Sequence, residues 1–180
     1  MRCLIIDGSG HVGGNTDQMC QMLKNMLSAK GCETRIERLR EGMEHCTGCG
    51  ICRSSACPIE DRLADIIRSL RGYDLLIVAT PIRFNGVSSQ TKTFIDRLNP
   101  MWFGKETMMP KTYAILVGGS PEPNFGNALS VLRSMAKGTG SEWGGSLEIS
   151  DTDRIPADAH LGELEDFVGT VLGENNRTGT

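Results

Sequence analysis

The chain has 180 residues, 39% of them hydrophobic, which is enough for one domain with a full core and leaves little room for a second. The formal net charge of −3 and the absence of a long lysine and arginine run argue against a nucleic-acid-binding surface. No apolar run approaches the roughly 18 residues of a membrane span, and no signal segment precedes the first expected strand, so we expect a cytoplasmic protein.

The first predicted element is a strand over residues 3–6, which leads into a glycine-rich loop and then a helix. The loop reads Asp-Gly-Ser-Gly-His-Val-Gly-Gly-Asn-Thr over residues 7–16. Its glycines let backbone N–H groups approach a ligand beside the positive end of the helix dipole, and Ser9, Asn15 and Thr16 add side-chain donors. The glycine spacing fits neither the dinucleotide fingerprint nor the nucleotide-triphosphate loop. We therefore predict a cradle for a mononucleotide phosphate, with an ordinary glycine-rich turn as the alternative.

The rest of the chain alternates between strand and helix patterns. Further strands are expected over residues 33–39, 74–79, 113–117 and 143–149. Apolar residues at helical spacing predict helices over residues 19–30, 63–70, 91–98, 129–136 and 161–172. The second and fifth strands alternate in polarity, as edge strands do, whereas the other three are continuously apolar. The pattern predicts an α/β fold with a five-stranded parallel sheet of order 2-1-3-4-5 between two helical layers. We expect residues 1–174 to form one domain and residues 175–180 a mobile tail.

Three loops follow the central strands of this predicted sheet, and they begin at Gly8, Thr80 and Gly118. In a sheet of this order, ligands bind at the carboxyl ends of the strands, beside the switch point between the first and third strands. We therefore expect the three loops to open onto one edge, where a flat aromatic cofactor with a phosphate tail would fit.

The first loop also carries a family resemblance. Residues 8–16 are similar in sequence and equal in length to the FMN-phosphate loop of NADPH-dependent FMN reductases, Gly-Ser-Pro-Arg-x-x-Gly-Asn-Thr/Ser. Gly10 and His11 replace the usual Pro and Arg. Since His11 carries a positive charge only when protonated, phosphate binding would rely more on backbone N–H groups than in the family pattern.

A second motif resembles the same branch of the flavodoxin-like superfamily. Residues 80–86 read Thr-Pro-Ile-Arg-Phe-Asn-Gly and are similar to the family's Pro-x-Tyr segment, with Arg83 in place of Tyr. Lys92, Asp96 and Arg97 match the Lys-x-x-x-Asp-Arg helix that follows it in the family. The Arg83 guanidinium would lie along the flavin edge, where it could stack on the ring or stabilise negative charge on a reduced flavin. A surface arginine paired with a carboxylate is the alternative.

The resemblance implies FMN as the cofactor, and FAD is not expected because the chain shows one phosphate cradle and no spare domain. It also implies NAD(P)H as the reductant and chemistry centred on the flavin, with Arg83 as the one candidate catalytic side chain. The residues expected to bind the cofactor are Ser9, His11, Gly14, Asn15, Thr16, Pro81, Ile82, Arg83, Phe84, Asn85, Gly86, Gly118, Gly119 and Ser120.

A cysteine-rich loop over residues 40–58 resembles that of the iron–sulfur flavoproteins of this family. Its spacing, C-x2-C-x2-C-x4-C, differs by one residue from the bacterial ferredoxin pattern and predicts ligation of a 4Fe–4S cluster. A zinc ion, or thiols without metal that are free or form disulfides, are the alternatives. Cys3 and Cys20 lie in predicted core elements and are expected to pack there. The four candidate ligands are Cys46, Cys49, Cys52 and Cys57.

These features together predict an FMN-dependent oxidoreductase that takes electrons from NAD(P)H or a ferredoxin-like protein. The acceptor would be a small molecule such as a flavin or a quinone, and a cluster in the cysteine loop would relay electrons. The alternatives are a non-enzymatic electron carrier and a thiol-based redox sensor. We expect a homodimer or homotetramer, because residues 101–103, Met-Trp-Phe, form an apolar patch that would be a subunit interface or a cover over the flavin.

Overall fold

The structure is a computed structural model that describes residues 1–104 and 109–174. Five parallel strands form one sheet in the order β2-β1-β3-β4-β5, which confirms the predicted architecture. The tail expected over residues 175–180 lies outside the described residues. The strands are β1 (Arg2–Asp7), β2 (Glu33–Arg38), β3 (Leu75–Pro81), β4 (Lys111–Val117) and β5 (Trp143–Ile149).

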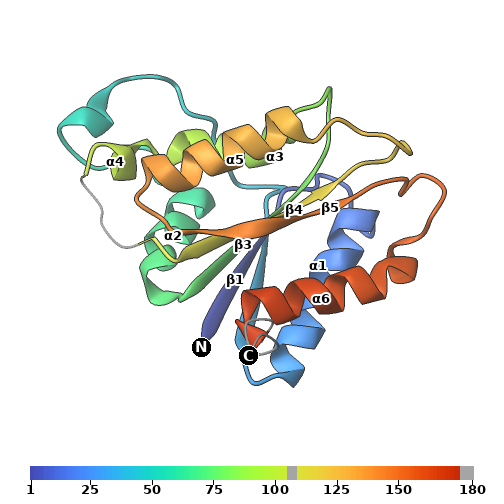
Figure 1. The fold of residues 1–180 in the computed structure, drawn as a ribbon. Helices are drawn as coiled ribbons and strands as arrows, with labels where there is room; N and C mark the ends of the chain where they lie inside the picture. The colour runs from blue at the N-terminus through green and yellow to red at the C-terminus, as the bar shows by residue number, and fades with distance from the viewer. Residues whose placement is uncertain (105–108, 175–180) are drawn as a thin grey trace.

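Helices cover both faces of the sheet (Figure 1). One face carries α1 (Asn15–Ala29) and α6 (Leu161–Val171). The other carries α2 (Arg62–Ser69), α3 (Ser89–Arg97), α4 (Asn99–Trp102) and α5 (Gly126–Gly138). Three short 3-10 turns complete the described elements: η1 (Ile51–Arg53), η2 (Leu70–Gly72) and η3 (Ala157–His160).

The short helix α4 is the one helix that the periodicity did not predict. Its Pro100 lies in the first turn, where a missing N–H group costs no intrahelical hydrogen bond, so the proline starts a helix as well as following one. None of the helices in the described part of the chain is long and apolar enough to cross a membrane.

Two hydrophobic cores lie on opposite faces of the sheet. Successive residues of a strand point to opposite faces, so Ile5 of β1 packs toward α1 and α6 while Leu4 packs toward α2, α3 and α5. Cys3 and Cys20 are completely buried in the first of these cores, as expected for packing residues. The sheet is therefore covered on both faces, and its carboxyl edge is left for the loops.

Candidate functional site

The loops that follow β1, β3 and β4 are joined by hydrogen bonds at the carboxyl edge of the sheet. Ser88 Oγ donates to the carbonyl oxygen of Gly8 at 2.6 Å, which connects the segment before α3 to the first loop. Asn15 Nδ2 donates to the carbonyl oxygen of Thr152 at 2.8 Å. The backbone N–H of Thr152 in turn donates to the carbonyl oxygen of Gly118 at 3.2 Å. The predicted meeting of the three loops is therefore observed.

The first loop packs so closely against α3 that Gly8 has no room for a side chain. A Cβ atom at Gly8 would lie 1.9 Å from Thr91 Oγ1 and 3.0 Å from the carbonyl oxygen of Ala79. Farther along, Gly13 has a φ of +70°, which favours glycine. Gly14 then precedes α1 without a side-chain cap. The positive end of this 15-residue helix thus faces the glycine loop, an arrangement that suits an anion.

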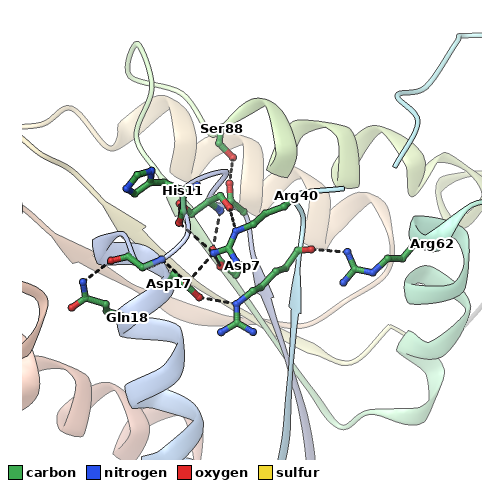
Figure 2. A network of polar contacts seen from close by, with 11 residues as sticks. Asp7, His11, Asp17, Gln18, Arg40, Arg62 and Ser88 are labelled. Carbon is green, nitrogen blue, oxygen red and sulfur yellow. Dashed lines mark hydrogen bonds and ion pairs between the residues drawn. The ribbon is translucent and has the colours of Figure 1, made fainter. Parts of the chain in front are cut away.

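A network of buried charges lies beneath this loop (Figure 2). Asp7 is completely buried and accepts from the backbone N–H of Ser9 at 2.8 Å and from Arg40 Nη2 at 3.0 Å. Arg40 Nη2 also lies 2.9 Å from Asp17 Oδ2. Asp17 accepts from the backbone N–H of Gly13 at 2.9 Å, so both ends of the loop are bound to carboxylates that Arg40 bridges.

The two carboxylates of this network have opposite pKa shifts. Burial raises the pKa of Asp7 to about 6, although the N–H of Ser9 and the charge of Arg40 act in the other direction. Burial also acts to raise the pKa of Asp17, but hydrogen bonds from Gly13, Arg38 and Arg40 outweigh it and lower that pKa to about 2. Asp17 is therefore charged at neutral pH, whereas Asp7 titrates in the mildly acidic range.

Sequence patterns indicate the glycine loop but not the charged network beneath it. Arg40 Nε donates to the carbonyl oxygen of Ser9 at 3.2 Å, and its Nη2 donates to that of His11 at 3.3 Å. A fixed positive charge is thus present beneath the loop, in addition to the exposed His11. The only local signal was the cluster of arginines at the end of β2, which by itself is typical of a solvated edge strand.

The predicted cofactor residues of the first loop differ in their surroundings. Ser9 and Thr16 are buried, and Ser9 Oγ accepts from the backbone N–H of His11 at 3.2 Å. Gly14 and Asn15 are half-buried. The amide of Asn15 is oriented by Thr152, a residue that sequence spacing did not connect to it.

The loop after β3 forms a tight turn with an exposed tip. The backbone N–H of Arg83 donates to the carbonyl oxygen of Gly86 at 3.0 Å, and the reverse bond measures 2.9 Å. Between them, Phe84 and Asn85 have φ values of +48° and +61°, which is strained backbone for a bulky residue such as Phe84. The exposed fraction of Phe84 is 105%, so the turn presents an aromatic ring to the outside of the sheet edge.

The remaining predicted residues flank this turn. Pro81 is the buried last residue of β3, and the backbone N–H of the half-buried Ile82 donates to the carbonyl oxygen of Val117 at 2.8 Å. Gly118 is buried, Gly119 is half-buried and Ser120 is exposed. The second and third loops therefore start side by side, because β3 and β4 are neighbours in the sheet.

The four cysteines of the cysteine-rich loop line one cavity of about 160 Å³. Three of them are half-buried, while Cys49 is exposed. In the described part of the chain, no three cysteine, histidine or acidic side chains form a group that could hold a single metal ion. The cysteines surround a shared space together with Asp96, Arg97, Asn99, Pro100 and Phe103, which come from α3, α4 and the residue after it.

The cysteine-rich loop follows β2, so its cysteines are expected at the same edge of the sheet as the glycine loop, but their cavity lies away from that edge. The loop starts at the carboxyl edge of the sheet, where the backbone N–H of Leu39 donates to the carbonyl oxygen of Asp7 at 2.9 Å, and it then runs past α3 to reach α4 (Figure 1). The cysteines therefore lie at the carboxyl end of α3, whereas Ser88 at its amino end contacts the glycine loop. Nine residues of helix separate the two sites along α3, about 14 Å at 1.5 Å per residue.

The base of the cysteine-rich loop is closed by a buried ion pair. Arg97, with a side chain only 1% exposed, faces Asp61 with its Nη1 at 2.9 Å and its Nη2 at 3.1 Å. The same nitrogens donate to the carbonyl oxygens of Glu44 and Ile59, at 2.8 and 3.0 Å. These carbonyls lie just before the first and just after the last cysteine, so one guanidinium holds both ends of the loop together.

Arg97 interacts with one of the cysteines and also carries a donor that no described residue satisfies. Burial acts to lower its pKa, but Asp61 and then the neighbouring Cys57 outweigh this effect, and the pKa of Arg97 lies above its ordinary value. Its Nε is buried and has no hydrogen-bond partner in the part of the chain that the structure describes. In the sequence, Arg97 stands out only as part of a family motif, because its partners lie 36 or more residues away.

The patch predicted over residues 101–103 is divided by the structure. Met101 is only 8% exposed and packs in the core, which contradicts its place in an exposed patch. Phe103 lines the cysteine cavity, and the guanidinium carbon of Arg53 lies over its ring, 5.8 Å from the ring centre of Phe103. Trp102 remains 63% exposed, beside a groove between α3 and α5.

Comparisons with known proteins agree with this geometry. An iron–sulfur flavoprotein of Methanocaldococcus jannaschii is 31% identical over 122 residues, which cover 67% of this chain and 63% of that protein. Among solved structures, a flavone reductase has a TM-score of 0.75 at 16% identity, covering 100% of this chain and 65% of the other. Oxidised flavodoxin 1 from Bacillus cereus has a TM-score of 0.66 at 15% identity, and the match covers 96% of this chain and 98% of the flavodoxin.

The structural likenesses show that the fold is flavodoxin-like. The chain spans less than two thirds of the length of the iron–sulfur flavoprotein that it matches. A family model described as NADPH-dependent FMN reductase matches residues 1–137, which include all three loops through Ser120 and the cysteine run. The chain therefore belongs to the NADPH-dependent FMN reductase family.

Proposed function

We propose that this protein is an FMN-dependent oxidoreductase that accepts electrons from NAD(P)H and passes them to a small acceptor such as a flavin or a quinone. Residues 1–174 would act as one FMN-binding unit. The observation that carries the proposal is the glycine loop at the uncapped amino end of α1, within the region that matches the family. Hydride and electron transfer would take place on the flavin, so the protein supplies binding, orientation and charge.

The FMN phosphate would bind at the first loop. Backbone N–H groups at the start of α1 and the hydroxyl of Thr16 are the donors, and the Asn15 amide would contribute where its bond to Thr152 leaves an N–H free. The Asp7–Arg40–Asp17 network would keep the loop in one conformation before the ligand arrives. Such preorganisation reduces the entropy that binding would otherwise cost.

The flavin ring would lie between the turn after β3 and the loop after β4. Phe84 and Arg83 are exposed on that turn, and both present planar groups that can stack on an aromatic ring. The positive charge of Arg83 would also favour a reduced, anionic flavin. The strained backbone at Phe84 is consistent with a turn whose shape serves a ligand.

The cysteine-rich loop fits a 4Fe–4S cluster. Each iron of such a cluster takes one cysteine thiolate, so the four sulfurs surround a shared space, as Cys46, Cys49, Cys52 and Cys57 do here. A zinc ion instead needs four ligand atoms around one point, at about 2.3 Å for sulfur. The unpaired Nε–H of Arg97 adds a donor of the kind that cluster sulfurs accept. When bound, the cluster would accept and release single electrons.

The phosphate site is tested by Asn15→Asp. A carboxylate at this position would lose the bond to the Thr152 carbonyl and repel the phosphate, so we expect at least a tenfold weaker affinity for FMN. Gln21→Glu introduces the same charge on an exposed position of α1 and should leave the affinity unchanged. Equal affinities of both variants, measured by fluorescence titration with FMN, would contradict the proposed position of the phosphate.

The cluster is tested by anaerobic purification and reconstitution, followed by assays of iron, acid-labile sulfide and FMN. We expect one 4Fe–4S cluster for each FMN, and we expect Cys52→Ser to lose the cluster while retaining FMN, since the phosphate loop is a separate element. Ser54→Ala, an exposed change within the same loop, is the matched control. A full FMN complement without iron or sulfide would contradict the cluster.

The activity itself is tested by anaerobic NADH and NADPH oxidation with flavin and quinone acceptors. Turnover with either nucleotide supports the proposal. Slow nucleotide oxidation together with rapid electron exchange with a ferredoxin would favour an electron carrier instead. A change of assembly on oxidation of the thiols would favour a sensor.

A further inference from the structure

Arg97 has one N–H donor more than the acceptors that the described residues provide for it. A guanidinium carries five N–H groups in a fixed plane. The four on Nη1 and Nη2 bind Asp61 and the carbonyl oxygens of Glu44 and Ile59. The fifth, on Nε, is buried and finds no partner in residues 1–104 and 109–174.

An unsatisfied N–H group in this position calls for an explanation. Buried polar groups in proteins nearly always have a partner, and arginine cannot avoid the cost by losing its proton. Rotation of the side chain would not help, because the bidentate contact with Asp61 fixes the plane of the guanidinium. An acceptor is therefore expected close to Nε.

The surroundings of Arg97 indicate the kind of acceptor. The side chain lines the cavity that the four cysteines share, and Cys57 interacts with its guanidinium. Sulfur atoms are therefore among the acceptors that this space offers, beside the side-chain oxygens of Asp96 and Asn99, and the Asp96 carboxylate is already bound by Lys92 at 2.6 and 2.8 Å. A thiolate or a cluster sulfide, both negatively charged, would accept from a cationic donor more strongly than a neutral thiol.

We propose that Arg97 donates its Nε–H to a sulfur of the iron–sulfur centre, either the Cys57 thiolate or an adjacent sulfide, and so acts as a positioning and potential-setting residue. The inference rests on the proposed function, in which the four cysteines hold a 4Fe–4S cluster. Hydrogen bonds to sulfur and net charge both set the reduction potential of such centres. Because an added electron increases the negative charge near the guanidinium, Arg97 would favour the reduced state.

The test uses the reconstituted protein labelled with 15N-arginine. After reduction of the cluster by one electron, pulsed electron paramagnetic resonance should detect a hyperfine coupling between the cluster spin and an arginine 15N. Arg97→Lys retains the positive charge but lacks Nε, so the coupling should disappear. Arg53 also lines the cavity, and Arg53→Lys should retain the coupling.

A second readout is the reduction potential measured by anaerobic titration. Arg97→Gln removes both the charge and the Nε–H, and we expect the equilibrium constant of one-electron reduction to fall about tenfold, which corresponds to 59 mV. Arg53→Gln should change the constant less than threefold, because Arg53 is exposed and contacts Phe103.

The outcomes separate this inference from the proposed function. A wild-type protein that binds FMN but no iron would overturn both. A loaded protein without an arginine coupling, or with one that survives in Arg97→Lys, would overturn the inference alone. If Arg97→Lys does not retain its cluster, the arginine coupling in Arg53→Lys decides the question. The coupling persists in that variant if Arg97 is the donor, and it is lost if Arg53 is the donor.

Discussion

Single residues of the first loop are under steric as well as chemical constraints. Gly8 lies so close to α3 that the hydroxyl of Thr91 occupies the space that a Cβ atom at Gly8 would need. Gly10 is also crowded, but its neighbour is the end of the flexible Gln90 side chain, which can move away. The two glycines therefore differ in how well they would tolerate a side chain, although the sequence pattern does not distinguish them.

Gly8→Ala is expected to destabilise the protein by about 1 to 3 kcal/mol, because the methyl group forces the loop away from α3. Gly10→Ala should cost less than about 1 kcal/mol. The free energies of unfolding from urea titrations compare the two variants. Equal losses would show that the packing of Gly8 against Thr91 does not matter to stability.

The raised pKa of Asp7 makes stability depend on pH. A carboxyl group with a higher pKa in the folded than in the unfolded state stabilises the fold fully below about pH 4, and this contribution is lost as the pH rises through about 6. Relative to Asp7→Asn, the wild-type free energy of unfolding should fall by about 2 to 3 kcal/mol from pH 4 to pH 7.

Asp17→Asn is the matched control, and its sign is opposite. Because the pKa of Asp17 is lowered, its contribution is present above about pH 4 and is lost as the pH falls through about 2. A pH-independent difference between wild type and Asp7→Asn, measured by urea unfolding, would contradict the raised pKa.

Elements of the fold are connected by charged side chains that the strand and helix patterns do not reveal. Arg40, the second residue after β2, joins the start of the cysteine-rich loop to the glycine loop through Asp7 and Asp17. Arg97 closes that same loop from α3. The cysteine-rich loop has little regular structure, and these two arginines, one at its start and one from α3, contact it where it begins and where it closes.

Arg40→Met is expected to destabilise the protein by about 3 to 5 kcal/mol at pH 7, because it leaves the buried Asp7 without its counter-charge. Asp7→Asn added to Arg40→Met should recover part of this loss, since the uncompensated charge is then absent. Arg38→Met should cost less than about 1 kcal/mol, because Arg38 is more exposed and Asp17 retains its ion pair with Arg40. Urea unfolding of these three variants and of Asp7→Asn alone measures the losses. Losses from Asp7→Asn and Arg40→Met that simply add in the double variant would contradict the expected coupling.

At the scale of the whole molecule, the two candidate sites lie at opposite ends of α3. The glycine loop contacts its amino end and the cysteine cavity its carboxyl end, about 14 Å apart by helix rise. Electrons moving between the two within one subunit would have to travel along this helix. A contact between subunits offers another route, which keeps the assembly state relevant to function.

We expect a homodimer or homotetramer in which Trp102 takes part in the contact. Trp102 is 63% exposed beside the groove between α3 and α5, so Trp102→Arg should weaken association at least tenfold. Leu161→Arg changes an exposed apolar residue on α6, across the sheet, and should leave association unchanged (Figure 1). Light scattering at micromolar concentration measures both. A monomer with a full FMN complement would show that no second subunit completes the site.

The sequence by itself determined the parts of this protein that depend on local patterns. Continuous and alternating apolar runs distinguish central from edge strands, so the order β2-β1-β3-β4-β5 was predictable. The glycine-rich loop and the cysteine spacing were visible too, because turn geometry and ligand spacing are local properties. Only the tertiary structure decided which distant side chains meet. Asn15 and Thr152 are 137 positions apart, and Arg97 and Asp61 are 36 apart. It also decided the path of the cysteine-rich loop, which no periodicity predicts because the loop has little regular structure and Arg97, which contacts both of its ends, comes from α3.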